Sequence, residues 1–75
     1  MPRLRDISGR KLVKIFENFG FEVIGQKGSH IKMSRADQIL VIPNHKSIAK
    51  GTLKEIYSQA SEFISEPELK KIFYT

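Results

Sequence analysis

The sequence contains no cysteine, which excludes disulfide bonds and thiolate metal sites. It also contains no run of about 18 apolar residues, so we expect no membrane span. The amino-terminal stretch Met-Pro-Arg-Leu-Arg-Asp lacks the apolar core of a secretory signal, and the expected location is therefore cytoplasmic. Two histidines and scattered carboxylates do not form a metal-ligand set, so the sequence predicts no metal and no other cofactor.

Repeats, linkers and low-complexity stretches are absent as well. A chain of 75 residues is short for more than one domain, and we expect a single domain over residues 1–75. Hydrophobic residues at 40% and charged residues at 28% argue against disorder. A core of this size is marginal, so nearly every large apolar residue should contribute to it.

Acidic side chains are in the minority. Thirteen Lys and Arg residues face eight Asp and Glu residues, which gives a net charge of +5. Nucleic acid is the commonest anionic partner of such a surface, and an acidic protein would be attracted by the same field. The alternative is that the charges only keep the domain soluble.

Two stretches carry apolar residues at the helical spacing i, i+3, i+4, i+7. The first is capped by Ser8 and ends before Gly20, and the second covers about residues 49–61. A short last helix is predicted after Ser65-Glu66-Pro67-Glu68, which has the pattern of a capping box with an early proline. The three apolar faces are Leu12, Ile15, Phe16 and Phe19; Leu53, Ile56, Tyr57 and Ala60; and Leu69, Ile72 and Phe73.

Three segments between the two longer helices are predicted to be strands. They cover residues 21–26, 29–34 and 38–42. Lys27-Gly28 supplies a tight turn between the first two, and Arg35-Ala36-Asp37 supplies the second turn.

The order α-β-β-β-α, followed by a short C-terminal helix, predicts an α+β domain with a three-stranded antiparallel sheet. Two amphipathic helices cover one face of such a sheet. In the middle strand Ile31 and Met33 alternate with His30 and Lys32, so His30 belongs to the uncovered face if the apolar pair faces the helices. In the third strand, the continuous apolar run 39–42 suggests burial on both faces.

Four short motifs occur in a fixed order along the chain. They are Gly20-Phe21-Glu22-Val23, Gln26-Lys27-Gly28-Ser29-His30, Pro43-Asn44-His45-Lys46 and Lys50-Gly51-Thr52-Leu53. At these spacings they resemble the HicA toxin family, with its Gly-Phe strand entry, Gly-Ser-His turn, Pro-x-His and Gly-Thr-Leu helix start. The resemblance covers about residues 8–60, and the segment from about residue 61 to 75 is longer than the family needs.

The resemblance implies a fold like the double-stranded RNA-binding domain. It further implies the toxin of a type II toxin–antitoxin system, a metal-independent endonuclease acting on messenger RNA, with a HicB-type antitoxin as partner. The family's catalytic histidine is that of Gly-Ser-His, which is His30 in this sequence. We expect single-stranded RNA as substrate because in-line attack needs a mobile backbone, and we expect no direct contact with DNA or a membrane.

RNA cleavage without a metal is chemically feasible because RNA carries its own nucleophile, the 2′-OH. An imidazole titrates near neutral pH and can act as base or acid, and a positioned general base contributes roughly 10²–10⁴-fold. The expected products are a 2′,3′-cyclic phosphate and a 5′-hydroxyl.

The neighbours of the catalytic histidine supply candidate RNA-binding groups. Lys27, Lys32 and Lys46 can neutralise the phosphate or hold the backbone. Gly28 allows the φ of the turn and lets RNA approach the backbone closely. For Ser29 we expect a structural or hydrogen-bonding role.

Several residues have two interpretations. His45 either stabilises its turn by a hydrogen bond or binds phosphate, and Gly51-Thr52 either offers backbone N–H groups to phosphate or is an ordinary helix entry. Lys70-Lys71 is interpreted as a solvated helix face. Four aromatic residues are interpreted as core rather than as base-stacking platforms: Phe16, Phe19, Phe21 and Tyr57.

Two other functions compete with the nuclease. A non-catalytic RNA-binding module of the same fold would bind RNA in a salt-sensitive way without cleaving it. A pure interaction protein would use its basic face only for an acidic partner and would not bind RNA at low salt.

Overall fold

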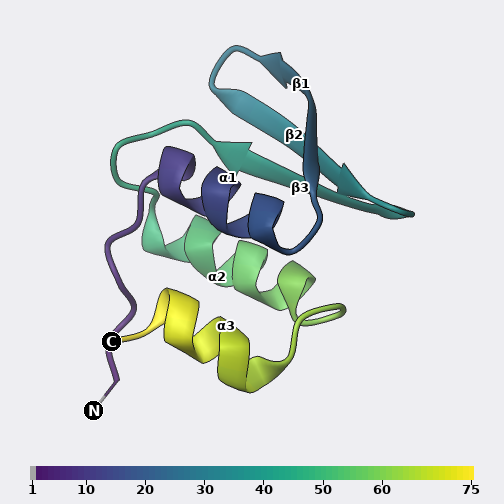
Figure 1. Cartoon of the computed structure of the whole chain (residues 1–75). Coiled ribbons are helices and arrows are strands. Elements are labelled where there is room, and N and C mark those ends of the chain that lie inside the picture. Colours follow the sequence, from purple (N-terminus) through teal and green to yellow (C-terminus); the bar gives the residue numbers. More distant parts are fainter. Residues whose placement is uncertain (1) are drawn as a thin grey trace.

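The computed structural model describes residues 2–75 as a three-stranded antiparallel sheet with its helices on one side (Figure 1). The elements are α1 (Gly9–Asn18), β1 (Glu22–Lys27), β2 (His30–Arg35), β3 (Gln38–Pro43), α2 (Lys50–Ala60) and α3 (Glu66–Phe73). Helices α1 and α2 both pack against β3, whereas α3 packs against α2 on the side away from the sheet. The predicted α+β class and element order are confirmed.

Both ends of α1 follow from local sequence. The Ser8 hydroxyl accepts a hydrogen bond from the backbone N–H of Lys11 at 3.1 Å, as the cap prediction requires. After the helix, Gly20 has a φ of +91°, and its backbone N–H donates to the carbonyl of Glu17 at 3.0 Å. A positive φ disfavours residues with a Cβ, so the glycine explains why the helix stops here.

The β1–β2 hairpin turns one residue later than predicted. Gly28 and Ser29 form the turn, while Lys27 is the last residue of β1 and pairs with His30. Gly28 has a φ of +58° at the first turn position, the conformation that a type II′ hairpin turn requires. Ser29 therefore belongs to the turn and not to the strand, because a two-residue loop matches the twist of the strands.

The two faces of the sheet differ in burial. In β3 the side chains alternate, and Ile39 and Val41 are 47% and 45% exposed. The expectation that this apolar run is buried on both faces was wrong, because the helices cover only one face. The residues that face the helices from β2 and β3 are buried as the alternation predicts: Ile31, Met33, Leu40 and Ile42.

The buried side chains of the three helices, of β2 and β3 and of the connecting segments form one apolar cluster. Phe16 and Phe21 lie inside it, with ring centroids 5.8 Å apart in an edge-to-face arrangement, whereas Phe19 and Tyr57 are only partly buried at its margin. Within residues 2–75, no polar or charged residue is buried. All side chains with acid–base chemistry in this part of the chain therefore lie at the surface.

Helix α3 docks by aromatic packing rather than through a capping box. Ser65 occupies the N-cap position, but its side chain makes no cap hydrogen bond, so that part of the prediction was wrong. Instead, Glu66 accepts a hydrogen bond from the Tyr57 hydroxyl at 2.8 Å, and the Tyr57 ring packs edge-to-face on Phe73 at 5.4 Å. Burial, together with the hydrogen bond and charge of Glu66, raises the pKa of Tyr57.

The two ends of the described chain lie side by side (Figure 1). The backbone N–H of Arg5 donates to the carbonyl of Phe73 at 2.7 Å, and the N–H of Thr75 donates to the carbonyl of Arg3 at 2.9 Å. The N-terminal segment is thus fixed to the end of α3. None of the helices in residues 2–75 has the length and apolar character needed to cross a membrane.

Candidate active site

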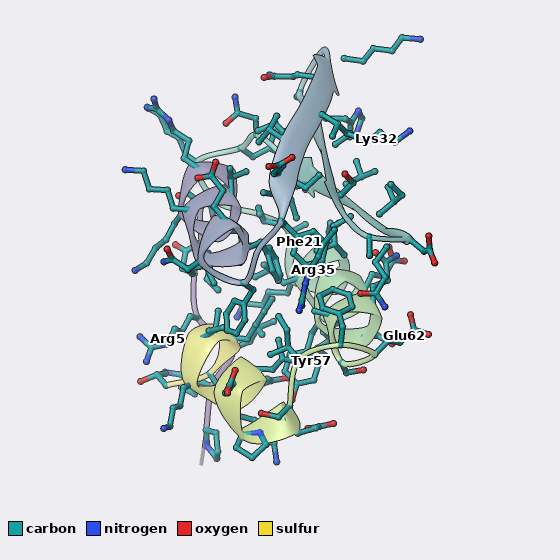
Figure 2. The ribbon with its side chains drawn as sticks, turned by 45° about the vertical axis from the view of Figure 1, so that its right-hand side comes forward. Arg5, Phe21, Lys32, Arg35, Tyr57 and Glu62 are labelled. Carbon is teal, nitrogen blue, oxygen red and sulfur yellow. The ribbon has the colours of Figure 1, made fainter. Side chains whose placement is uncertain are left out.

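His30 is the first residue of β2 and is exposed. In the sheet register it lies between Lys27 of β1 and Pro43 of β3. Its side of the strand also carries Lys32, which Figure 2 shows on the side of the sheet away from α1. The imidazole is therefore not packed beneath a helix, and a ribose-phosphate can reach it.

The loop after β3 is held by backbone hydrogen bonds at the same end of the sheet. The N–H of Asn44 donates to the carbonyl of Ser29 at 2.6 Å, and the N–H of Gly9 donates to the carbonyl of His45 at 2.9 Å. Because these bonds involve the backbone, the main chain of His45 is fixed although its side chain is exposed.

Gly9 makes this loop position sterically possible. A Cβ added to Gly9 would lie 2.9 Å from the carbonyl carbon of Pro43 and 3.0 Å from the Cα of Asn44, and closer still to the Pro43 oxygen. The first turn of α1 can approach the loop this closely only because residue 9 has no side chain.

His30 and His45 line one cleft of about 480 Å³ between β3 and α2. One wall comes from the outer face of β3, with its exposed aliphatic side chains Ile39 and Val41. The rest of the lining comes mainly from α2, next to the edge of β3, and its polar contributions are Thr52, Glu55 and Gln59. The cleft therefore joins the two histidines of the sequence to a polar helix face.

The sequence pointed to Thr52 only through its backbone N–H, and Glu55 and Gln59 were missed. Thr52, Glu55 and Gln59 are spaced i, i+3 and i+7, so they share one side of the helix. That spacing, directly after the loop with the second histidine, was an available signal. The spacing alone did not reveal that this side of α2 lies next to the edge of β3.

Two imidazoles in one cleft can accept and donate protons in the same reaction. Glu55 adds one carboxylate to the lining of the same cleft. Among residues 2–75 there is no group of three or more His, Cys, Asp or Glu side chains that could hold a metal ion.

None of the five residues predicted to bind RNA lines this cleft. Lys27 lies across from His30, Lys32 is two residues further along the same strand, and Lys46 directly follows His45. Gly28 and Ser29 form the hairpin turn next to the histidine, and the carbonyl of Gly28 accepts a hydrogen bond from the side chain of Gln26 at 3.0 Å.

The start of α2 adds to the positive character of the site. Ala49 provides no side-chain cap, and the first turn contains no acidic residue. The positive end of the helix dipole is therefore not offset locally, and both Ala49 and Thr52 line the cleft.

Comparison with known protein families gives a match over residues 9–61 to the family described as HicA toxin of bacterial toxin–antitoxin systems. The match runs from the first residue of α1 to the residue after α2 and includes both histidines. It leaves residues 1–8 and 62–75 outside. No curated protein and no solved structure matches the chain.

Proposed function

Because the chain belongs to the HicA toxin family of bacterial toxin–antitoxin systems, we propose that it is an endoribonuclease that cleaves messenger RNA with His30 as its catalytic residue. The observation that carries the proposal is the position of His30. Its imidazole is exposed at the end of β2, and it lines a cleft together with the second histidine of the chain. The predicted likeness to double-stranded RNA-binding domains remains what the family resemblance implies.

The proposed reaction needs no metal. His30 takes the proton of the ribose 2′-OH as the 2′-oxygen forms a bond to phosphorus. The bond from phosphorus to the 5′-oxygen breaks, and that oxygen takes up a proton. The products are a 2′,3′-cyclic phosphate and a 5′-hydroxyl.

We assign the second proton transfer to His45. Its main chain is fixed by the hydrogen bond from Gly9, and its side chain lines the same cleft as His30. A protonated imidazole there can deliver a proton to the leaving 5′-oxygen. This assignment replaces the two earlier interpretations of His45, turn stabilisation and simple phosphate binding.

The surroundings of the cleft suit a single RNA strand. Lys27, Lys32 and Lys46 supply cations around it, and the backbone of Gly28 and Ser29 is open to close approach. In-line attack requires a backbone that can rotate freely, which regular A-form duplex resists. We therefore propose single-stranded message as the substrate.

Toxins of this kind generally pair with an antitoxin, and we propose a HicB-type partner that covers His30. An acidic partner surface would be attracted by the net charge of +5 and would associate rapidly by electrostatic steering. A stoichiometric amount of the antitoxin is expected to stop cleavage.

The decisive experiment incubates the purified protein with end-labelled single-stranded RNA in EDTA. The wild type should cleave, and His30→Ala should lose cleavage by at least about a hundredfold while remaining folded. Ser34→Ala is the matched control, because Ser34 lies on the same strand face but not in the cleft. A 5′-phosphate on the product, or full activity of His30→Ala, contradicts the proposal.

A pH series separates the two histidines. If one imidazole accepts and the other donates a proton, the wild-type rate passes through a maximum with pH. His45→Ala should lower the rate and remove the alkaline limb of that profile. An unchanged bell-shaped profile would show that His45 does not donate the proton. Salt-sensitive binding without any cleavage would instead support the non-catalytic RNA-binding module.

A further inference from the structure

A second hollow of about 800 Å³ lies away from the histidines and is bordered by cations. Its walls come from the N-terminal segment and from α1, α2 and α3. Five basic side chains line it: Arg3, Arg5, Lys11, Lys50 and Lys71. We call this hollow the basic groove. Asp6 is the one acidic residue among the described residues that line it, and its carboxylate accepts a hydrogen bond from Ser47.

The basic groove is built largely by parts of the chain outside the family match. Arg3, Arg5 and Lys71 lie beyond residues 9–61. They are brought together because the N-terminal segment pairs with the end of α3, where the Arg5 Nε also donates to the carbonyl of Tyr74 at 2.9 Å. Figure 1 shows this segment passing the start of α2 and the end of α3.

A third hollow, of about 380 Å³, shares lining residues with both the basic groove and the cleft of the two histidines. It shares Ala49 with the cleft and shares Arg5 and Lys50 with the basic groove. The start of α2, at Ala49 and Lys50, therefore borders all three hollows.

We propose that the basic groove binds the phosphodiester backbone of the same single-stranded RNA, beyond the nucleotides at the histidines. This rests on the proposed function for the identity of the bound strand. The groove offers arginine guanidinium groups, which bind phosphate in a bidentate way, together with three lysines. Because the start of α2 borders both the groove side and the cleft side, one extended polyanion is favoured over an acidic protein that docks at the groove alone.

The groove has a consequence for substrate choice. Phosphate contacts carry no base information, so they strengthen binding of any sequence that is long enough to reach. The chain should therefore prefer longer single strands to short ones, with the cut made at the cleft.

The test is RNA binding by the full chain in a His30→Ala background, measured with a labelled single-stranded RNA of mixed sequence. Arg3→Gln combined with Lys71→Gln removes two groove cations. Lys14→Gln combined with Lys54→Gln is the control, because it removes the same charge from exposed helix positions outside the groove. Thermal unfolding of both double variants confirms that they are folded.

The groove variant should bind RNA about tenfold more weakly than the control at low salt. The slope of log affinity against log salt should fall by about 1.4, because each phosphate contact on a single strand contributes about 0.7. Equal RNA affinities of the two double variants overturn the proposal. Poly-glutamate serves as a second probe. If the groove variant loses binding to poly-glutamate but not to RNA, the proposal is also overturned, because the occupant would then be an acidic protein.

The groove and control variants, made again with His30 restored, distinguish a failure of the groove inference from a failure of the proposed function. If the wild type does not cleave RNA but the groove variant still binds RNA selectively less well, the groove inference stands and the nuclease proposal fails. If the wild type cleaves and the groove variant binds RNA as the control does, the nuclease proposal stands and the groove inference fails.

Discussion

The backbone N–H of Asn44 donates to the carbonyl of Ser29 at 2.6 Å, which connects the residue before one histidine to the residue before the other. This single bond extends the β2–β3 pairing by one step beyond His30 and Pro43. It keeps the loop after β3 next to the β1–β2 turn. The relative position of His30 and His45 is therefore a property of the main chain.

Amide hydrogen exchange should reveal this connection. The N–H of Asn44 belongs to an exposed residue in an irregular loop, yet its exchange should be slowed at least about a hundredfold relative to an unfolded chain. The N–H of Gly9 should be protected with it, since it donates to the carbonyl of His45. Exchange of Asn44 as fast as in the exposed turn at Gly28 would show that the loop opens freely.

Gly9→Ala should be strongly destabilising. The added methyl group would collide with backbone atoms of Pro43 and Asn44, which cannot rotate away as a side chain can. We expect a loss of about 2–3 kcal/mol in the free energy of unfolding, and a fall in Tm of roughly 10 °C or more.

Gly51→Ala is the matched control for that substitution. Gly51 lies in α2, and nothing is within 4 Å of an added Cβ. Replacing a helical glycine by alanine stabilises by about 0.5–1 kcal/mol, so the two variants should move the denaturation midpoint in opposite directions. Similar midpoints would contradict the close contact between α1 and the loop.

Replacing the two N-cap serines by alanine should lower the free energy of unfolding by different amounts. Ser8→Ala removes a hydroxyl that accepts the Lys11 N–H and should cost about 1 kcal/mol. Ser65→Ala removes a hydroxyl without a cap hydrogen bond and should change stability by no more than roughly 0.5 kcal/mol. Urea denaturation measures the stability of both variants. An equal loss of stability would show that the Ser65 side chain also caps its helix.

Val41→Glu should impair activity without unfolding the protein. Val41 is 45% exposed, lines the cleft and pairs with Lys32, so a carboxylate there is solvated and lies near the proposed path of the phosphate. Cleavage should fall by about tenfold, the effect of roughly 1.4 kcal/mol of added repulsion. Val41→Thr, which adds no charge, should retain the rate, and equal rates for both variants would place the RNA elsewhere.

Local periodicity explains what the sequence predicted well. The helical stripes placed Leu12, Phe16 and Leu53 in the core, and the alternation of β2 placed His30 on the open face. These features depend on neighbours within one turn or two residues, so they can be recognised without knowing what packs against them. Gly20 was also recognisable, because its left-handed conformation is a local requirement.

The features that were missed depend on contacts between distant segments. The apolar run of β3 did not reveal that Ile39 and Val41 remain outside, because that depends on how many helices cover the sheet. The hydrogen bond from Tyr57 to Glu66, which joins α2 to α3, was not visible in the local pattern that suggested a cap at Ser65. Likewise, the cleft and the basic groove each combine segments that are remote in sequence.

The wholly apolar interior has a consequence for how stability depends on pH. Folding of residues 2–75 buries no ionised side chain, so acid does not have to discharge an internal ion pair. The clearest proton linkage is at Tyr57, where burial and then Glu66 raise the pKa above 10.0. A raised pKa in the folded state means stability that is complete at neutral pH and declines under alkaline conditions, as the unfolded chain releases that proton first. Rate profiles across the neutral range should thus report proton transfer rather than loss of the fold.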